Sequence, residues 1–197
     1  PGRAARKPHR GEEVIQLSRR IPLLSLRENP LIRWDRLQRR EYQERIAEEA
    51  IKRNTLVVLP TALGKTIIAV LAASYYIYNY SDKRVLFLAP TKPLVHQHQQ
   101  TILRALKLRP EDACVITGEQ EPELRLHLWD KSGARVFLAT PESVRNDIEN
   151  GLSLRDFSLI VFDEAHRARK DYAYTKVAGA YLEHSTHPMI LGLTASP

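Results

Sequence analysis

Six short apolar runs constrain the fold of this 197-residue chain more than any other feature of its sequence. They lie at residues 56–59, 85–88, 114–116, 136–138, 159–162 and 189–193. Each is rich in Val, Ile, Leu or Phe and lacks polar alternation, which is typical of parallel strands covered on both faces. Helical patterns separate the runs at 65–79, 92–106, 121–131, 142–150 and 173–184. This alternation predicts an α/β fold with an open, mostly parallel sheet and helices on both faces.

The positive charge of the chain is concentrated near its N-terminus. The formal charge is +7, and residues 1–53 carry 14 basic and 8 acidic side chains, so that residues 54–197 are nearly neutral. The basic segment is either an auxiliary phosphate-binding arm or a solvated tail. We divide the chain into a basic, partly disordered extension and lead-in over residues 1–40 and one domain over residues 41–197.

Composition excludes several classes of protein. Hydrophobic residues make up 43% of the chain, too many for wholesale disorder. The single cysteine, Cys114, excludes an internal disulfide framework and a Cys-rich metal site, and it fits a reducing, intracellular compartment. No apolar stretch follows the basic N-terminus, and the uncharged run at 66–81 is too short and too mixed to span a membrane. We therefore expect an intracellular protein without a membrane segment.

The first apolar run leads into the loop Pro60-Thr61-Ala62-Leu63-Gly64-Lys65-Thr66. A Gly-Lys-Thr sequence between a strand and a helix is typical of a phosphate-binding loop. Backbone N–H groups at the helix start would cradle phosphate oxygens, and Gly64 would allow their close approach. Lys65 would contact the β- and γ-phosphates, and the Thr66 hydroxyl would ligate Mg²⁺. The loop from Thr61 to Thr66 is therefore a candidate nucleotide site, although Leu59 stands where the general pattern has its first glycine.

Two adjacent carboxylates, Asp163 and Glu164, directly follow the apolar run at 159–162. Charges at the end of a buried strand are costly unless they meet cations. We expect Asp163 to lie in the Mg²⁺ shell and Glu164 to orient and deprotonate the attacking water. With Lys65 as the phosphate contact, these residues would supply both halves of ATP hydrolysis.

Five segments together resemble the motifs of superfamily 2 helicases of the DEAH type. They are residues 59–66, 89–95, 139–141, 163–166 and 194–196, in the order that the family has. Five stretches are similar in sequence to the branch-point translocase group, which includes archaeal Hef and the Fanconi-anaemia group M proteins. They are residues 54–61, 89–95, 159–167, 171–174 and 191–197. This resemblance implies a RecA-like P-loop NTPase fold, ATP and Mg²⁺ as cofactors, and branched or forked DNA as a partner.

The resemblance also implies roles for single residues. Gln43 matches the residue that reads adenine, which suits an amide that both donates and accepts, and Arg40 belongs to the same nucleotide-binding entry segment; a plain surface Gln is the alternative. Ala62 stands where the family usually has glycine, and if this position needs a positive φ, alanine costs about 1 kcal/mol and weakens nucleotide binding. His166 either couples the site to Thr194 and Ser196 or only caps a turn.

Proteins of this family bind the backbone of a nucleic-acid strand, and the resemblance implies a second set of candidates for that contact: Thr91, Lys92, Thr140 and the pair Thr117-Gly118. Hydroxyls, one Lys and helix N-termini suit phosphate contacts that carry no sequence information. The alternative for each Thr is ordinary helix capping. Sequence-specific base reading is not expected, because the chain has no helix-turn-helix or finger signature.

We interpret the chain as the ATP-binding domain of an ATP-dependent DNA helicase or translocase that acts on forks or Holliday junctions in DNA repair. The parent chain would supply a second RecA-like domain with an arginine finger, so that this domain alone hydrolyses ATP slowly and does not translocate. The expected location is the cytoplasm or nucleoid of an archaeon, or a eukaryotic nucleus. Two alternatives stay open: an RNA-directed relative, like the Dicer or innate-sensor helicases, and a noncatalytic nucleic-acid-binding or partner-docking module.

Overall fold

The computed structural model describes residues 23–169 and 172–195 of the chain. Six strands form a single sheet in the order β1-β6-β5-β2-β4-β3, and every pair of neighbours is parallel. The strands are β1 (Thr55–Val58), β2 (Arg84–Leu88), β3 (Ala113–Ile116), β4 (Val136–Ala139), β5 (Phe157–Phe162) and β6 (Ile190–Thr194). The six predicted apolar runs each coincide with a strand to within two residues, which confirms the parallel α/β architecture.

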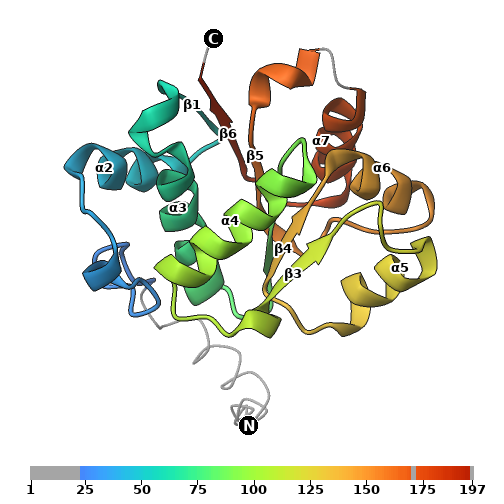
Figure 1. The fold of residues 1–197 in the computed structure, drawn as a ribbon, viewed down its shortest axis with the longest axis horizontal. Coiled ribbons are helices and arrows are strands. Elements are labelled where there is room, and N and C mark those ends of the chain that lie inside the picture. The colour runs from blue at the N-terminus through green and yellow to red at the C-terminus, as the bar shows by residue number, and fades with distance from the viewer. Residues whose placement is uncertain (1–22, 170–171, 196–197) are drawn as a thin grey trace, which may run out of the picture.

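The helices lie in two layers, one on each face of the sheet (Figure 1). They are α2 (Glu41–Ala50), α3 (Lys65–Asn79), α4 (Lys92–Ala105), α5 (Pro122–Lys131), α6 (Pro141–Glu149) and α7 (Tyr172–His184). Short 3-10 turns lie at η1 (Trp34–Arg36), η2 (Thr61–Leu63), η3 (Pro110–Asp112) and η4 (Ala165–Arg169). The apolar stripe of residues 42–51 predicts a helix over 41–53, and α2 ends three residues earlier, at Ala50.

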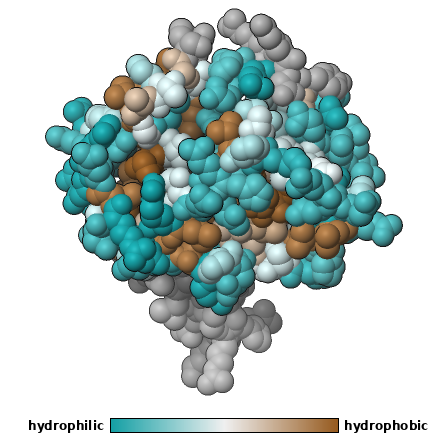
Figure 2. Space-filling view, viewed as in Figure 1, coloured by the Kyte–Doolittle hydropathy of each residue, from teal (hydrophilic) through white to brown (hydrophobic). Residues whose placement is uncertain are grey.

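The strands alternate their side chains between two hydrophobic cores. On β2, Val85 and Phe87 join the core beneath α2, α3 and α4, whereas Leu86 and Leu88 join the core beneath α5, α6 and α7. Both faces of the central strands are therefore buried, which is why their sequences carry no polar alternation. Figure 2 shows a mainly hydrophilic outer face with several separate hydrophobic patches.

The segment that precedes α2 packs against the first core. Leu26 and Ile32 are buried there, Ile32 forms a bridge with Leu106 at the end of α4, and Asn29 donates to the Ser74 hydroxyl at 3.2 Å. The composition of residues 1–12 predicts that the disordered part of the extension lies there, and these residues are outside the described ones. The domain boundary at residue 40 stays a prediction.

Candidate functional site

The predicted phosphate loop connects the carboxyl end of β1 to the first turn of α3. Its last residue before the helix, Gly64, has φ 72° and ψ 43°, a left-handed conformation that side chains disfavour. A Cβ at Gly64 would lie 2.4 Å from the Nε2 atom of Gln43. The backbone conformation therefore requires glycine at this position, and a Cβ would also push the Gln43 amide away from the loop.

Lys65 and Thr66 open α3 with different surroundings. The Lys65 side chain is buried, and its Nζ donates to the carbonyl of Leu59 at 2.7 Å, across the loop. The hydroxyl of Thr66 has no hydrogen-bond partner among the described residues. The ammonium group thus already lies inside the loop where phosphate oxygens are expected.

Ala62 does not have the conformation that would make alanine costly. It lies in the turn η2, and among residues 23–169 and 172–195 the single non-glycine residue with positive φ is Glu164, at 53°. The condition for a strain penalty at Ala62 is not met, so the weakening of nucleotide binding that we attached to it has no support in this backbone.

Gln43 lies on α2 and contacts the loop directly. Its Nε2 donates to the carbonyls of Leu63 at 3.2 Å and Gly64 at 3.3 Å, and the neighbouring Tyr42 hydroxyl donates to Leu63 at 2.7 Å. These contacts disfavour the alternative that Gln43 is a plain surface glutamine. A cavity of about 210 Å³ beside them is lined by Arg36, Leu37, Gln38, Arg40, Gln43, Ala62, Gly64, Ile67 and Arg104. The structure thus brings Arg40 and Gln43 together with the loop around one small cavity.

The two adjacent carboxylates lie at the carboxyl end of β5. Asp163 is buried, and one of its carboxylate oxygens, Oδ1, accepts the N–H of Glu164 at 2.9 Å. That bond braces the left-handed backbone of Glu164, which is uncommon for a residue with a Cβ. The other oxygen of Asp163, Oδ2, lies 2.7 Å from Nε2 of His98 on α4, a contact that sequence reasoning did not predict.

His166 links the acidic segment to the end of β6. Its Nδ1 lies 3.0 Å from the Thr194 hydroxyl and 3.4 Å from a carboxylate oxygen of Glu164. This geometry agrees with a coupling contact more than with a simple turn cap. Ser196, the third predicted member, lies outside the described residues.

The nucleic-acid candidates follow β2, β4 and β3. The Thr91 hydroxyl is exposed and caps α4 by accepting the N–H of Leu94 at 3.5 Å. Lys92 forms an ion pair with Glu119 in the loop after β3, which joins two of the candidate segments. Gly118 is exposed in that same loop.

The hydroxyls of Thr117 and Thr140 are less accessible than expected. Both residues are buried, and the Thr140 hydroxyl lies 2.8 Å from that of Ser143. The Thr117 hydroxyl accepts the N–H of Glu119 at 3.5 Å. Thr91, Lys92 and Gly118 are the more accessible candidates, and phosphate contacts by all five residues stay a prediction.

The sheet order separates the two sets of candidates. The phosphate loop and the acidic pair follow β1 and β5, Thr194 ends β6 between these two strands, and Gln43 on α2 contacts the loop, whereas the nucleic-acid candidates follow β2, β4 and β3. All lie at the carboxyl edge of the sheet, where open α/β sheets bind ligands. Three residues that contact these candidates were not identified from the sequence: His98, Tyr42 and Glu119. Only His98 left a signal, a polar residue in the apolar stripe Val95, His98, Ile102 and Ala105 of α4.

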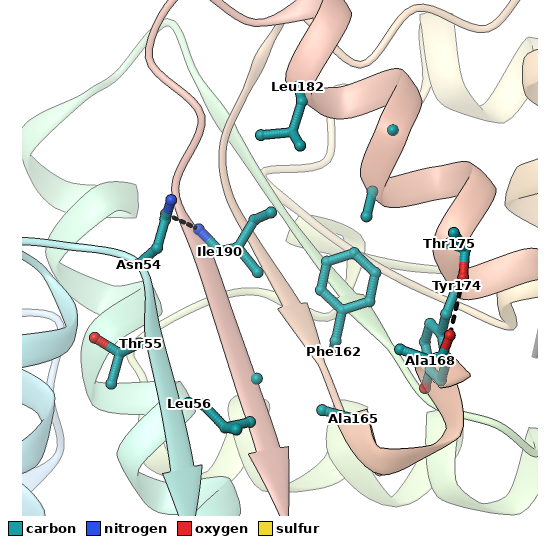
Figure 3. Close-up of a pocket in the computed structure, with 13 residues that line it drawn as sticks. Asn54, Thr55, Leu56, Phe162, Ala165, Ala168, Tyr174, Thr175, Leu182 and Ile190 are labelled. Carbon is teal, nitrogen blue, oxygen red and sulfur yellow. Dashed lines mark hydrogen bonds between the residues drawn. The ribbon is translucent and has the colours of Figure 1, made fainter. Parts of the chain in front are cut away.

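A larger apolar cavity of about 750 Å³ lies on the other side of the sheet from the phosphate loop's helix (Figure 3). Figure 3 shows Leu182 of α7, Phe162 of β5, Ile190 of β6 and Leu56 of β1 around it. The exposed faces of Leu56 and Leu182 leave this groove hydrophobic, and the polar candidates above do not line it. Its size therefore does not mark the chemical site.

The part of the chain that the structure describes holds neither a cluster of metal-ligating side chains nor a membrane-spanning helix. No group of three or more His, Cys, Asp or Glu side chains is arranged to hold a metal ion in the part of the chain described. The oxygen donors of Thr66 and Asp163 suit Mg²⁺, which is commonly bound by one or two protein ligands together with phosphates. Within residues 23–169 and 172–195, no helix has the length and apolar character needed to cross a membrane.

Comparisons with known proteins agree with this geometry. A family model described as "Type III restriction enzyme, res subunit" matches residues 36–197. A putative ATP-dependent RNA helicase of Methanocaldococcus jannaschii is 42% identical over 171 residues, which are 86% of this chain and 21% of that protein. The DEAD-box ATP-dependent DNA helicase Fancm of Drosophila melanogaster is 39% identical over 163 residues, 80% of this chain and 11% of that protein.

A solved structure supports the same assignment. The crystal structure of the Pyrococcus furiosus Hef helicase domain has a TM-score of 0.79 and 48% sequence identity, and the match covers 85% of this chain and 35% of that one. The predicted RecA-like fold is confirmed. The chain spans only 21% and 11% of the length of the two curated relatives above. It belongs to the family described as type III restriction enzyme res subunits, and its relatives there are ATP-dependent helicases of the Hef and Fancm type.

Proposed function

We propose that this chain is the ATP-binding domain of an ATP-dependent DNA helicase or translocase that acts on branched DNA. One observation carries the proposal: the phosphate loop, Gln43 and the Asp163–Glu164 pair share one half of the carboxyl edge, and a second set of phosphate-binding candidates occupies the other half. In this proposal a nucleotide and a nucleic-acid strand bind at separate, neighbouring parts of one sheet.

In the nucleotide half, residues of three elements converge on the phosphates. Lys65 exchanges its bond to the Leu59 carbonyl for the β- and γ-phosphate oxygens, so that little side-chain movement is needed. Gln43 and Arg40 line the small cavity beside the loop, which fits adenine. Backbone N–H groups from Thr61 to Thr66 surround the phosphates.

Thr66 and Asp163 are the residues that would hold Mg²⁺ in this site. The ion, when bound, neutralises charge that develops on the phosphate oxygens. Glu164 projects beside Asp163, partly exposed, and orients the attacking water and accepts its proton. His166 lies between Glu164 and Thr194, and it passes changes at the nucleotide to the segment that ends in Ser196.

In the nucleic-acid half, Thr91, Lys92 and Gly118 contact the phosphate backbone, and Thr117 and Thr140 add contacts if their segments open. These groups read no bases, so binding is independent of sequence and weakens as salt rises. A second RecA-like domain of the parent protein completes the site. Its arginine finger, worth about 10³–10⁵ in rate, explains why this domain alone should turn over slowly. We infer an intracellular parent protein, in the cytoplasm or nucleoid of an archaeon or in the nucleus of a eukaryote, because its curated relatives bear the names of helicases.

RNA is the second candidate substrate, because one relative bears the name of a putative RNA helicase. Competition among a forked DNA, a duplex DNA and a duplex RNA of equal length, measured by anisotropy at one salt concentration, separates the two. Preferential displacement by the fork supports the DNA proposal. Preferential displacement by duplex RNA would replace it.

The nucleotide site itself is tested by titrating Mg-ATP into the chain and into Lys65→Ala. We expect wild type to bind and the variant to lose affinity by more than 10-fold, because the Lys65 ammonium already lies across the loop where the phosphates are expected. Lys131→Ala, an exposed lysine on α5, is the matched control and should bind as wild type does. Equal binding by Lys65→Ala and wild type would leave the noncatalytic module as the better account.

A further inference from the structure

His98 lies where the two halves of the carboxyl edge meet. It belongs to α4, which begins after β2 on the nucleic-acid side, and its Nε2 is 2.7 Å from Oδ2 of Asp163, which follows β5 on the nucleotide side. β2 and β5 are adjacent in the sheet, and the N–H of Asp163 donates to the carbonyl of Leu88 at 2.9 Å. The contact therefore joins the first helix of one half to a carboxylate of the other.

The hydrogen bond between His98 and Asp163 has a defined donor and acceptor. A carboxylate only accepts hydrogen bonds, so Nε2 of His98 must donate. The other ring nitrogen, Nδ1, is buried and has no hydrogen-bond partner in the described part of the chain. Packing alone does not account for this arrangement, because an apolar side chain would fill the stripe on α4 without leaving a buried nitrogen unpaired.

Two bonds fix the orientation of the Asp163 carboxylate. Oδ1 accepts the N–H of Glu164, and Oδ2 accepts from His98. Among residues 23–169 and 172–195, His98 is the only basic side chain within ion-pair distance of Asp163. The first bond is local, whereas the second depends on where α4 lies over the sheet.

We propose that His98 is a positioning residue that fixes the Asp163 carboxylate for the divalent metal and makes that orientation depend on nucleic-acid contact at the start of α4. The inference rests on the proposed function. Lys92 and Thr91 lie six and seven residues before His98, so that about 9–10 Å of rigid helix separates the phosphate contact from the carboxylate contact. A shift of α4 on binding nucleic acid would reach Asp163 through this one bond.

Three variants isolate the bond. His98→Leu removes the donor and keeps an apolar filler, whereas His98→Gln carries an amide N–H₂ to the position of Nε2. His98→Asn carries the same amide on a shorter side chain that does not reach Oδ2, and it serves if the leucine variant fails to fold. Partners that orient metal-ligating carboxylates typically affect metal affinity by about 10- to 100-fold.

The first measurement is Mn²⁺ binding to the 197-residue chain with saturating ATP, followed by the electron paramagnetic resonance signal of free Mn²⁺. We expect His98→Leu or His98→Asn to raise the Mn²⁺ concentration at half-saturation by about 10-fold or more. His98→Gln should restore a value close to wild type. Nucleotide binding without metal and the thermal unfolding midpoint serve as controls for the loop and the fold.

The second measurement repeats the Mn²⁺ titration with a bound DNA oligonucleotide. In wild type and His98→Gln, DNA should shift the half-saturating Mn²⁺ concentration, and in His98→Leu or His98→Asn it should not. If a folded His98→Leu or His98→Asn variant binds Mn²⁺ as wild type does, while Lys65→Ala has lost ATP binding, this inference is overturned and the proposed function is not. Failure of wild type to bind ATP would overturn the proposed function and this inference with it.

Discussion

A buried ion pair between α5 and α6 gives the sharpest prediction about stability. The Asp147 carboxylate is fully buried and accepts from Nη2 of Arg125 at 2.7 Å, from Nε of Arg125 at 3.0 Å, and from the indole Nε1 of Trp129 at 2.8 Å. The remaining terminal nitrogen, Nη1 of Arg125, donates to the carbonyl of Gln120 at 2.7 Å. One carboxylate thus satisfies two buried side chains and indirectly supports the loop after β3.

Asp147→Ala leaves the Arg125 guanidinium and the Trp129 indole N–H buried without their acceptor. Removing one partner of a buried, hydrogen-bonded ion pair typically costs about 3–5 kcal/mol, because the other charge remains desolvated. A domain of this size loses about 2–4 °C of midpoint for each kcal/mol, so the unfolding midpoint should fall by roughly 10 °C. That loss is a large part of a typical total stability of about 5–15 kcal/mol.

Urea unfolding followed by circular dichroism measures the loss, with Asp130→Ala as the matched control. Asp130 lies on α5 and is exposed, so its removal should change the free energy of unfolding by less than about 0.5 kcal/mol. The double variant Arg125→Met/Asp147→Leu should recover much of the loss, because apolar residues leave no buried charge unpaired. Asp147→Ala and Asp130→Ala with equal unfolding midpoints would refute the reasoning.

Three further predictions follow from single contacts. Glu119→Gln should tighten DNA binding by about 2- to 5-fold in a low-salt anisotropy titration, since Lys92 no longer pairs with a competing carboxylate, and unchanged affinity would mean that Lys92 does not contact phosphate. Gly64→Ala should cost about 1–2 kcal/mol in urea unfolding and weaken ATP binding, because it combines a positive φ with a Cβ against Gln43; wild-type behaviour in both would contradict this. Burial raises the pKa of the Cys114 thiol, so that less thiolate is present at any pH near 8. Alkylation of Cys114 by iodoacetamide, followed by mass spectrometry, should therefore be slower in the folded chain than in urea. Equal rates of alkylation would contradict this prediction.

The fold was predictable because its main signals are local. Val85–Leu88 and the other apolar runs showed doubly covered strands, and the Gly-Lys-Thr sequence at residues 64–66 defined both a strand end and a helix start. Helix α3 begins and ends where the pattern predicts. The errors are small and lie at the ends, where α2 stops at Ala50 although the apolar periodicity continues to Ile51.

Candidate residues for the site could be named from the sequence, but the contacts between them could not. The sequence marked Lys65, Asp163 and Gln43 as candidates, yet it gave no reason to pair His98 with Asp163, which are 65 residues apart. The same holds for Lys92 and Glu119, which belong to different crossover units. At Ala62 the sequence suggested a backbone strain that the structure does not have, because residue identity does not specify the φ angle on which the strain depends.

The sequence by itself determined the parallel sheet, the strand–loop–helix unit around Gly64 and the candidate residues for nucleotide binding, because apolar patterning and short motifs act over a few neighbouring residues. Only the tertiary structure decided which strands are neighbours, and hence that the nucleotide candidates and the nucleic-acid candidates occupy separate halves of one edge. Contacts such as His98 with Asp163 depend on how a whole helix lies over the sheet. Packing of both cores sets that position, and no local stretch of sequence encodes it.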